Sequence, residues 1–72
     1  MMIEFGKIYR HYKGGLYKPL FIARHSENED ELVIYQNVEN PELIWARPVE
    51  MWNDIVDKKG TLRFKLIEAD EK

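Results

Sequence analysis

The sequence predicts a small all-β domain of five short strands, with one short helical turn before the last strand. Several short runs alternate apolar and polar residues with period two, which is the pattern of half-buried strands. Glycine, proline and asparagine separate these runs, and turns favour these residue types. A chain of 72 residues forms one hydrophobic core and is too short for two. We therefore expect a single domain over 1–72, ordered from about residue 5 to 67.

The first two strands are expected to form a hairpin around a double glycine. Residues 7–12 alternate between two sides, and residues 16–24 form the second strand. Gly14 and Gly15 supply the positive φ that a tight hairpin turn requires. Symmetric pairing about residues 13–15 would set His11 opposite Tyr17. Pro19 cannot donate a ladder hydrogen bond, so it indicates an edge position or a bulge.

Three further strands and the helical turn follow. Polar residues 25–30 connect to a third strand at 31–38, and an Asn-Pro step interrupts the chain before a short fourth strand at 43–46. The period changes over 47–56, where Pro48 and Glu50 suit one to two helical turns. A fifth strand covers 62–67, and the charged residues 68–72 are expected to be disordered. This order predicts a small five-stranded barrel, SH3-like or OB-like.

Composition excludes several classes of function. The chain has no cysteine, which rules out disulfides, thiolate zinc sites and cysteine catalysis. No apolar run is long enough to span a membrane, and the N-terminal residues lack a secretion pattern. The sequence therefore predicts a soluble, cytoplasmic protein with no membrane partner.

Charge is unevenly distributed along the chain. Residues 1–25 contain five Lys or Arg and one acid, whereas residues 26–50 contain seven acids and one arginine. The net charge of −2 argues against a uniformly basic nucleic-acid binder. A local basic face remains compatible with these numbers.

Four fragments of the chain form a characteristic combination: Tyr9–Tyr17, Ala23–Glu27, Val33–Tyr35 and Trp45–Trp52. Taken together, they closely resemble the small bacterial family known as domain of unknown function family 1653. The resemblance covers nearly the whole chain, and it implies an SH3-like barrel without a settled activity. The chain departs from the family pattern at Trp52, where phenylalanine is usual, at Asn28, where threonine is more frequent, and in the loop 37–43.

The two histidines do not form a catalytic or metal-binding signature. Each follows an arginine, and consecutive strand residues face opposite sides of a sheet. Two histidines 13 positions apart fall short of the three or four ligands of a metal site. We therefore predict no metal, no cofactor and no enzymatic activity. The alternative is a small enzyme or enzyme accessory that uses His25 with Ser26 or Glu27.

The cationic and aromatic residues favour a binding surface over a catalytic or metal-binding site. Arginine matches carboxylates and phosphates, and tyrosine and arginine concentrate binding energy at interfaces. We predict a binding module that contacts a protein or a small anionic ligand; a nucleic-acid-binding module is the alternative, because stacked aromatic residues beside cations suit single strands. The predicted site consists of Arg10, His11, Tyr12, Arg24, His25 and Arg47.

Structural roles compete with this prediction. His11 is flanked by tyrosines and could be a partly buried hydrogen-bonding residue, and His25 could hold the turn that follows it. Trp45 and Trp52 could both belong to the core. An assembly role, with an exposed edge strand near Pro19 as the contact, is a further alternative.

Overall fold

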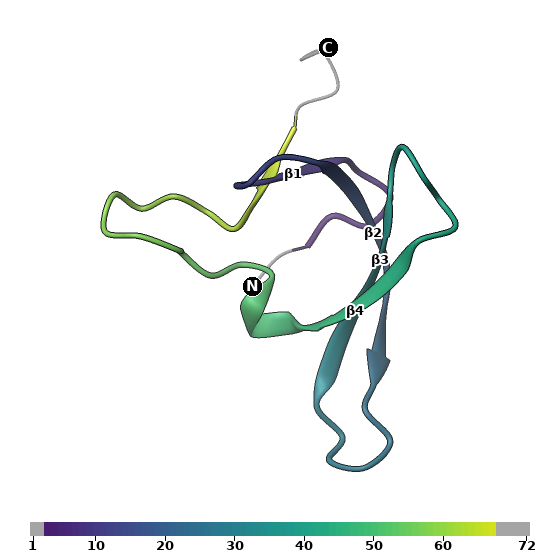
Figure 1. The fold of residues 1–72 in the computed structure, drawn as a ribbon. Helices are drawn as coiled ribbons and strands as arrows, with labels where there is room; N and C mark the ends of the chain where they lie inside the picture. The colour runs from purple at the N-terminus through teal and green to yellow at the C-terminus, as the bar shows by residue number, and fades with distance from the viewer. Residues whose placement is uncertain (1–2, 68–72) are drawn as a thin grey trace.

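A computed structural model of the protein describes residues 3–67. Five antiparallel strands form one sheet in the spatial order β4, β3, β2, β1, β5 (Figure 1). One short 3-10 turn, η1, precedes the last strand. The elements are β1 Tyr9–His11, β2 Leu16–Arg24, β3 Glu31–Asn37, β4 Ile44–Pro48, η1 Val49–Met51 and β5 Phe64–Leu66. The predicted all-β class, five strands and helical turn are confirmed.

The sheet curls without closing into a barrel. Strands β4 and β5 are the two ends of the strand order, and they do not pair with each other within residues 3–67. Figure 1 shows the segment after η1 looping out before it reaches β5, and a single bridge joins Ile55 to Leu62 inside that loop. The barrel predicted from the sequence is therefore only loosely supported, because side-chain packing takes the place of closing hydrogen bonds.

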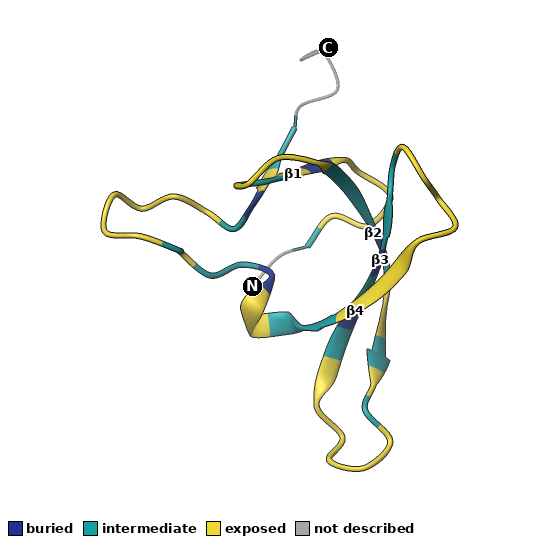
Figure 2. Ribbon diagram, in the orientation of Figure 1, coloured by how far each residue is buried: buried dark blue, intermediate teal, exposed yellow. Residues whose placement is uncertain are grey.

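Aromatic side chains fill the concave side of the sheet. The buried core consists of Tyr9, Val33, Tyr35, Trp52 and Phe64 (Figure 2). The Trp52 ring lies flat on Phe64 with centroids 3.9 Å apart, and Tyr9 and Tyr35 meet Trp52 edge-on at 5.3 and 5.0 Å. Stacked and edge-on aromatic pairs stabilise beyond the area they bury. This cluster joins β1, β3, β5 and the residue after η1.

The first hairpin has a different register from the symmetric one. Tyr9 pairs with Tyr17, and the His11 N–H donates to the Gly15 carbonyl at 3.0 Å. The prediction that His11 faces Tyr17 is therefore wrong. The loop consists of residues 12–14, because Gly14, with φ +105°, takes the left-handed position at the end of a three-residue hairpin loop.

Pro19 lies in the middle of the sheet, not at its edge. It is buried, it pairs with Tyr35 of β3, and the register shifts between Pro19 and Phe21. The bulge predicted at this proline is confirmed, whereas its use as an exposed edge contact is excluded. The Gly6 N–H donates to the Pro19 carbonyl at 2.9 Å, so the lead-in segment covers this part of β2.

The last third of the chain differs from its prediction in extent. Strand β4 continues to Pro48, and η1 is one 3-10 turn closed by the Trp52 N–H and the Val49 carbonyl at 3.0 Å. The turn number is thus at the lower end of the one to two turns expected, and the turn covers only a small part of the range 47–56. Asp54 then pairs with Arg63, which holds the chain in a loop. The tail 68–72, expected to be disordered, lies outside the described residues.

Strands β2 and β3 extend past the core as a hairpin that projects from the molecule (Figure 1). The turn of this hairpin is acidic and exposed, with Glu27, Glu29, Asp30 and Glu31 at or beside it. In the part of the chain that the structure describes, no helix is long and apolar enough to cross a membrane.

Candidate anion-binding site

An open groove lies between β1 and the loop that leads into β5. Its volume is about 400 Å³, at the lower end of the range of ligand sites. We call it the β1–β5 groove. It is lined by Arg10, His11, Tyr12, Gly60, Thr61, Leu62 and Lys65.

Two cations stand directly opposite each other in this groove. Arg10 of β1 pairs with Lys65 of β5, and both residues are exposed. Neither forms an ion pair with an acid among residues 3–67. Like charges directly opposite each other in a sheet are destabilising, so an anion between them would remove an unfavourable interaction.

Tyr12 presents an exposed ring beside further cations. It follows β1 in the hairpin loop and is 42% exposed. The Lys13 Nζ lies 5.7 Å from the ring centroid and the Arg63 Cζ lies 5.9 Å from it. Both distances are within the range of cation–π attraction, so aromatic surface and positive charge meet at this end of β1.

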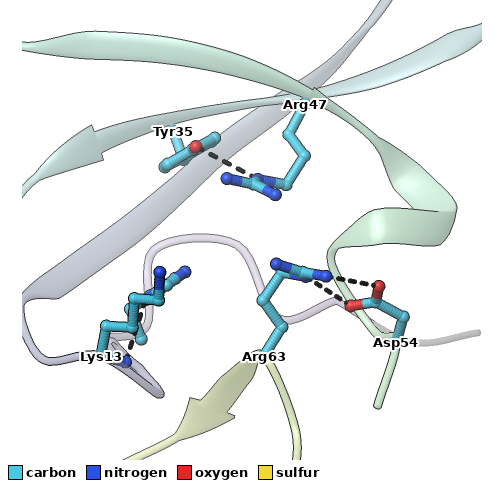
Figure 3. Close-up of polar contacts among 6 residues, drawn as sticks. Lys13, Tyr35, Arg47, Asp54 and Arg63 are labelled. Carbon is cyan, nitrogen blue, oxygen red and sulfur yellow. Dashed lines mark hydrogen bonds and ion pairs between the residues drawn. The ribbon is translucent and has the colours of Figure 1, made fainter. Parts of the chain in front are cut away.

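Arg63 is held by a carboxylate. Its Nε and Nη2 donate to the two Asp54 carboxylate oxygens at 2.7 and 3.0 Å (Figure 3). These two bonds form the bidentate geometry that makes an Arg–carboxylate pair strong. The same bonds hold the pKa of Asp54 below its ordinary value and raise the pKa of Arg63. Arg63 is consequently partly neutralised, unlike Arg10 and Lys65.

Arg47 approaches the site from the core side of β4. Its Nε donates to the Tyr35 hydroxyl at 3.4 Å, and its guanidinium carbon lies 5.5 Å from the Phe64 ring centroid. Figure 3 shows Arg47 and Arg63 extending toward the same space. No carboxylate pairs with Arg47 among residues 3–67.

His11 contacts the rings of Tyr12 and Phe64 and lies near three cations. Its ring lies 4.8 Å from the Tyr12 ring and 4.9 Å from the Phe64 ring between centroids. Its Nδ1 accepts the Lys13 N–H at 3.2 Å, which leaves Nε2 to carry the proton in the neutral ring. Partial burial lowers the pKa of His11, and Arg47, Arg63 and Lys13 lower it further. A neutral His11 therefore offers one N–H donor in a positive environment.

The structure separates Arg24 and His25 from the other predicted site residues. Arg10 pairs with Leu16 at one end of β2, whereas Arg24 pairs with Glu31 at the other end, roughly 25 Å away at about 3.3 Å per residue. Arg24 makes one long exposed ion pair, 4.0 Å, with Glu29. The predicted six-residue site thus divides into three parts: Arg10, His11 and Tyr12 line the groove, Arg47 lies on the core side and acts on His11, and two residues lie on the projecting hairpin.

His25 has a local role in the hairpin turn. Its Nδ1 accepts the Glu27 N–H at 3.1 Å, as His11 does for Lys13 two residues later in its own turn. The reading of His25 as a residue that holds the following turn therefore agrees with its contacts. The enzyme hypothesis based on His25 gains no support from this geometry, since Ser26 and Glu27 are exposed.

Lys65 and Thr61 belong to the groove but were absent from the predicted site. The alternation of residues 62–67 places Arg63 and Lys65 on one side of the last strand. Only the pairing of β5 with β1 brings that side next to Arg10, and this pairing joins segments more than 50 positions apart in the sequence. Strand neighbours at such separation have no local sequence signal.

The fold and the groove define a small all-β domain with an open cationic surface. The family model described as "Protein of unknown function (DUF1653)" matches residues 7–66, and the chain belongs to this family. It is also similar to the crystal structure of a protein belonging to DUF1653 from Bordetella bronchiseptica, with 30% sequence identity and a TM-score of 0.73. That match covers 93% of this chain and 92% of the other. No curated protein matches the chain.

Proposed function

We propose that the protein is an anion-binding module and that the β1–β5 groove receives the anion. The observation that carries the proposal is the pair Arg10 and Lys65, two exposed cations directly opposite each other, with no acid paired to them among residues 3–67. Arginine and lysine contribute charge-assisted hydrogen bonds, which are stronger than neutral ones. A carboxylate or phosphate group between the two side chains would accept from both.

The remaining walls of the groove fit this proposal. Gly60 and Thr61 line the side opposite β1. Asp57, the nearest acid in that loop, is engaged with the turn, since its Oδ1 accepts the backbone N–H of Lys59 at 2.9 Å and of Thr61 at 3.1 Å. These N–H groups lower the pKa of Asp57. Its carboxylate is thereby occupied within its own turn, which leaves Arg10 and Lys65 for a ligand.

We expect weak binding of a small anion, because the groove is open to solvent. Two hydrogen bonds to charged groups, each contributing about 1.5–3 kcal/mol, correspond to a Kd of roughly 0.05–10 mM. The physiological ligand in this proposal is therefore an anionic group on a larger partner, for which the groove supplies one of several contacts. The cytoplasmic location expected from the sequence stays a prediction that cell fractionation checks.

Titration of the labelled protein with inorganic phosphate and with acetate tests the proposal. The amide signals of residues 10–12 and 60–65 should shift and saturate, and the double variant Arg10→Gln/Lys65→Gln should lose the response. Arg24→Gln is the matched control, because Arg24 is an exposed arginine on the far hairpin and its loss should leave the titration unchanged. Equal responses in the wild type and the double variant would contradict the proposal.

Single-stranded nucleic acid is a second candidate ligand, favoured by the exposed Tyr12 ring, which lies close to Lys13 and Arg63. A base stacked on Tyr12 would bring its phosphates close to these cations. This reading predicts an affinity for an oligonucleotide that falls linearly in log salt and drops in Tyr12→Ala. If acetate or phosphate binds and an oligonucleotide does not, the nucleic-acid candidate is excluded and the small-anion candidate remains.

A further inference from the structure

The outer edge of β4 has no strand partner among residues 3–67, and its first half is apolar. Strand β4 ends the sheet on one side, and Leu43, Ile44 and Trp45 are 43, 56 and 47% exposed. Natural sheets protect such edges with charges, prolines, bulges or a covering segment. β4 has a charge and a proline only at its C-terminal end, at Arg47 and Pro48, whereas residues 43–46 carry neither. The other edge strand, β5, has only three residues and carries Lys65 at its centre.

The free hydrogen-bonding groups of this edge belong to Ile44 and Ala46. The Asn37 N–H donates to the Leu43 carbonyl at 3.0 Å, so residue 43 turns its carbonyl toward β3. Backbone groups point alternately to the two sides of an antiparallel strand, and residues 45 and 47 therefore also face β3. Ile44 and Ala46 consequently direct their N–H and C=O groups away from the sheet.

Side-chain direction along β4 follows the same alternation. Trp45 pairs with Tyr35, which is buried in the core, so Trp45 lies on the concave side of the sheet. Ile44 and Ala46 pair with Gln36 and Ile34 on the convex side. The edge thus offers one large and one small apolar side chain on its convex side, with an aromatic ring between them on the other side.

We propose that two copies of the chain pair through β4, antiparallel about a two-fold axis that passes through Trp45. In this register Ile44 of each copy lies opposite Ala46 of the other, so the outward backbone groups of both residues find partners in four hydrogen bonds. Each large side chain then faces a small one, and the two Trp45 residues meet as a non-hydrogen-bonded pair. The edge is its own complement, which favours a second copy as the partner.

The small area buried in this contact predicts a weak dimer. The exposed half of Trp45 corresponds to roughly 100 Å², given the 150–250 Å² that an aromatic side chain can bury. With its apolar neighbours the edge buries less than the roughly 800 Å² per partner of a standard interface. The dimer is therefore weak, with a Kd of about micromolar to millimolar, and it forms as the concentration rises.

Sedimentation velocity over a concentration series tests this pairing. Ala46→Pro removes the outward N–H while the hydrogen bonds between β3 and β4 remain, since edge strands tolerate proline when its nitrogen faces away from the sheet. We expect at least a ~10-fold weaker dimer for this variant. Phe21→Ser is the control, because Phe21 is 55% exposed on the convex side in the central strand β2 and should leave the Kd unchanged.

Each of the other possible results also decides whether the β4 pairing is correct. A wild type that stays monomeric at millimolar concentration overturns the proposal, as does a dimer that Phe21→Ser abolishes and Ala46→Pro preserves, which would indicate stacking of convex faces. If the amide spectrum shows that Ala46→Pro does not fold, Ile44→Lys is used in its place. This variant places two like charges beside the two-fold axis and should also weaken the dimer. A contact between the Trp45 Hα protons of two copies in a mixed-isotope sample must appear, and its absence in the dimer excludes this register.

Discussion

Trp52 lies parallel to Phe64, with ring centroids 3.9 Å apart and planes inclined by only 5°. The two rings come from the end of η1 and from β5, on either side of the gap in the sheet. Trp52 is 0% exposed. This contact does what hydrogen bonds between β4 and β5 would do in a closed barrel, and the stability of the domain should depend on it.

Replacement of Trp52 by alanine should therefore unfold much of the protein. A Trp→Ala change in a core costs about 3–5 kcal/mol, and a small domain has roughly 5 kcal/mol to lose. Trp52→Phe should cost less, because it keeps the stack and removes an indole N–H that has no hydrogen-bond partner within residues 3–67. Urea unfolding at low protein concentration measures both. Trp45→Ala is the control, expected within about 1 kcal/mol of the wild type.

The two glycines of the first hairpin should respond differently to alanine. Both have positive φ, +105° at Gly14 and +89° at Gly15, which costs an L-residue about 1–2 kcal/mol. A Cβ at Gly15 would also lie 3.1 Å from the Tyr17 ring, whereas at Gly14 it would meet nothing within 4 Å. Gly15→Ala should thus destabilise more than Gly14→Ala in thermal unfolding. Equal losses would mean that Tyr17 moves aside at no cost.

The Asp54–Arg63 pair should make stability depend on pH in the acid range. The pKa of Asp54 is lowered in the folded protein, mainly by the Arg63 hydrogen bonds. The unfolded chain therefore takes up this proton at a higher pH, and the stabilisation is present above pH ~4 and is lost as the pH falls through the folded pKa. Asp54→Asn should reduce the free energy of unfolding at pH 7 by at most about 1 kcal/mol, as for other solvent-accessible ion pairs. A difference that persists once Asp54 is protonated in both the folded and the unfolded protein would contradict the pairing.

His11 should titrate below its ordinary value and report on the groove. Because its folded pKa is lowered, the free energy of unfolding should decrease as the pH falls below about 6.5, until His11 is protonated in both states. Arg47→Gln removes one of the cations that lower the pKa, so it should raise the midpoint followed by the ring-proton signal. Arg24→Gln, on the distant hairpin, should leave that midpoint unchanged.

The same titration tests the site with ligand present. A bound anion counteracts Arg47, Arg63 and Lys13, so saturating phosphate should raise the pKa of His11. The Arg10→Gln/Lys65→Gln variant should show the low midpoint with or without phosphate. A rise of equal size in both proteins would mean that the anion acts elsewhere.

Local patterns in the sequence predicted where the strands lie along the chain, but they did not predict that β1 pairs with β5. The alternation at residues 31–37 and the turn at Gly14 depend on side-chain spacing and φ, which adjacent residues determine. The pairing of β1 with β5 depends on how the whole sheet curls, and it alone brings Lys65 to Arg10. The predicted site for this reason included Arg10 at the end of β1 and omitted Lys65, the cation opposite it.

The inclusion of Arg24 and His25 shows the same limit from the other direction. The prediction grouped them with Arg10 and His11 because it placed the cationic and aromatic residues on one binding surface. β2 is nine residues long, and an extended strand of that length keeps its two ends apart. What the dipeptides share is a turn, since each histidine accepts the N–H of the second residue after it.

The length of β2 also separates charge of opposite sign. The acidic hairpin turn lies at one end of β2 and the cationic groove at the other, so the strand keeps these two groups of charges apart. Beyond the Debye length of about 8 Å at physiological salt, an anionic partner experiences little of either. Within that distance, attraction to the groove and repulsion from the acidic turn would favour encounters in which the groove faces the anion that we propose as its ligand.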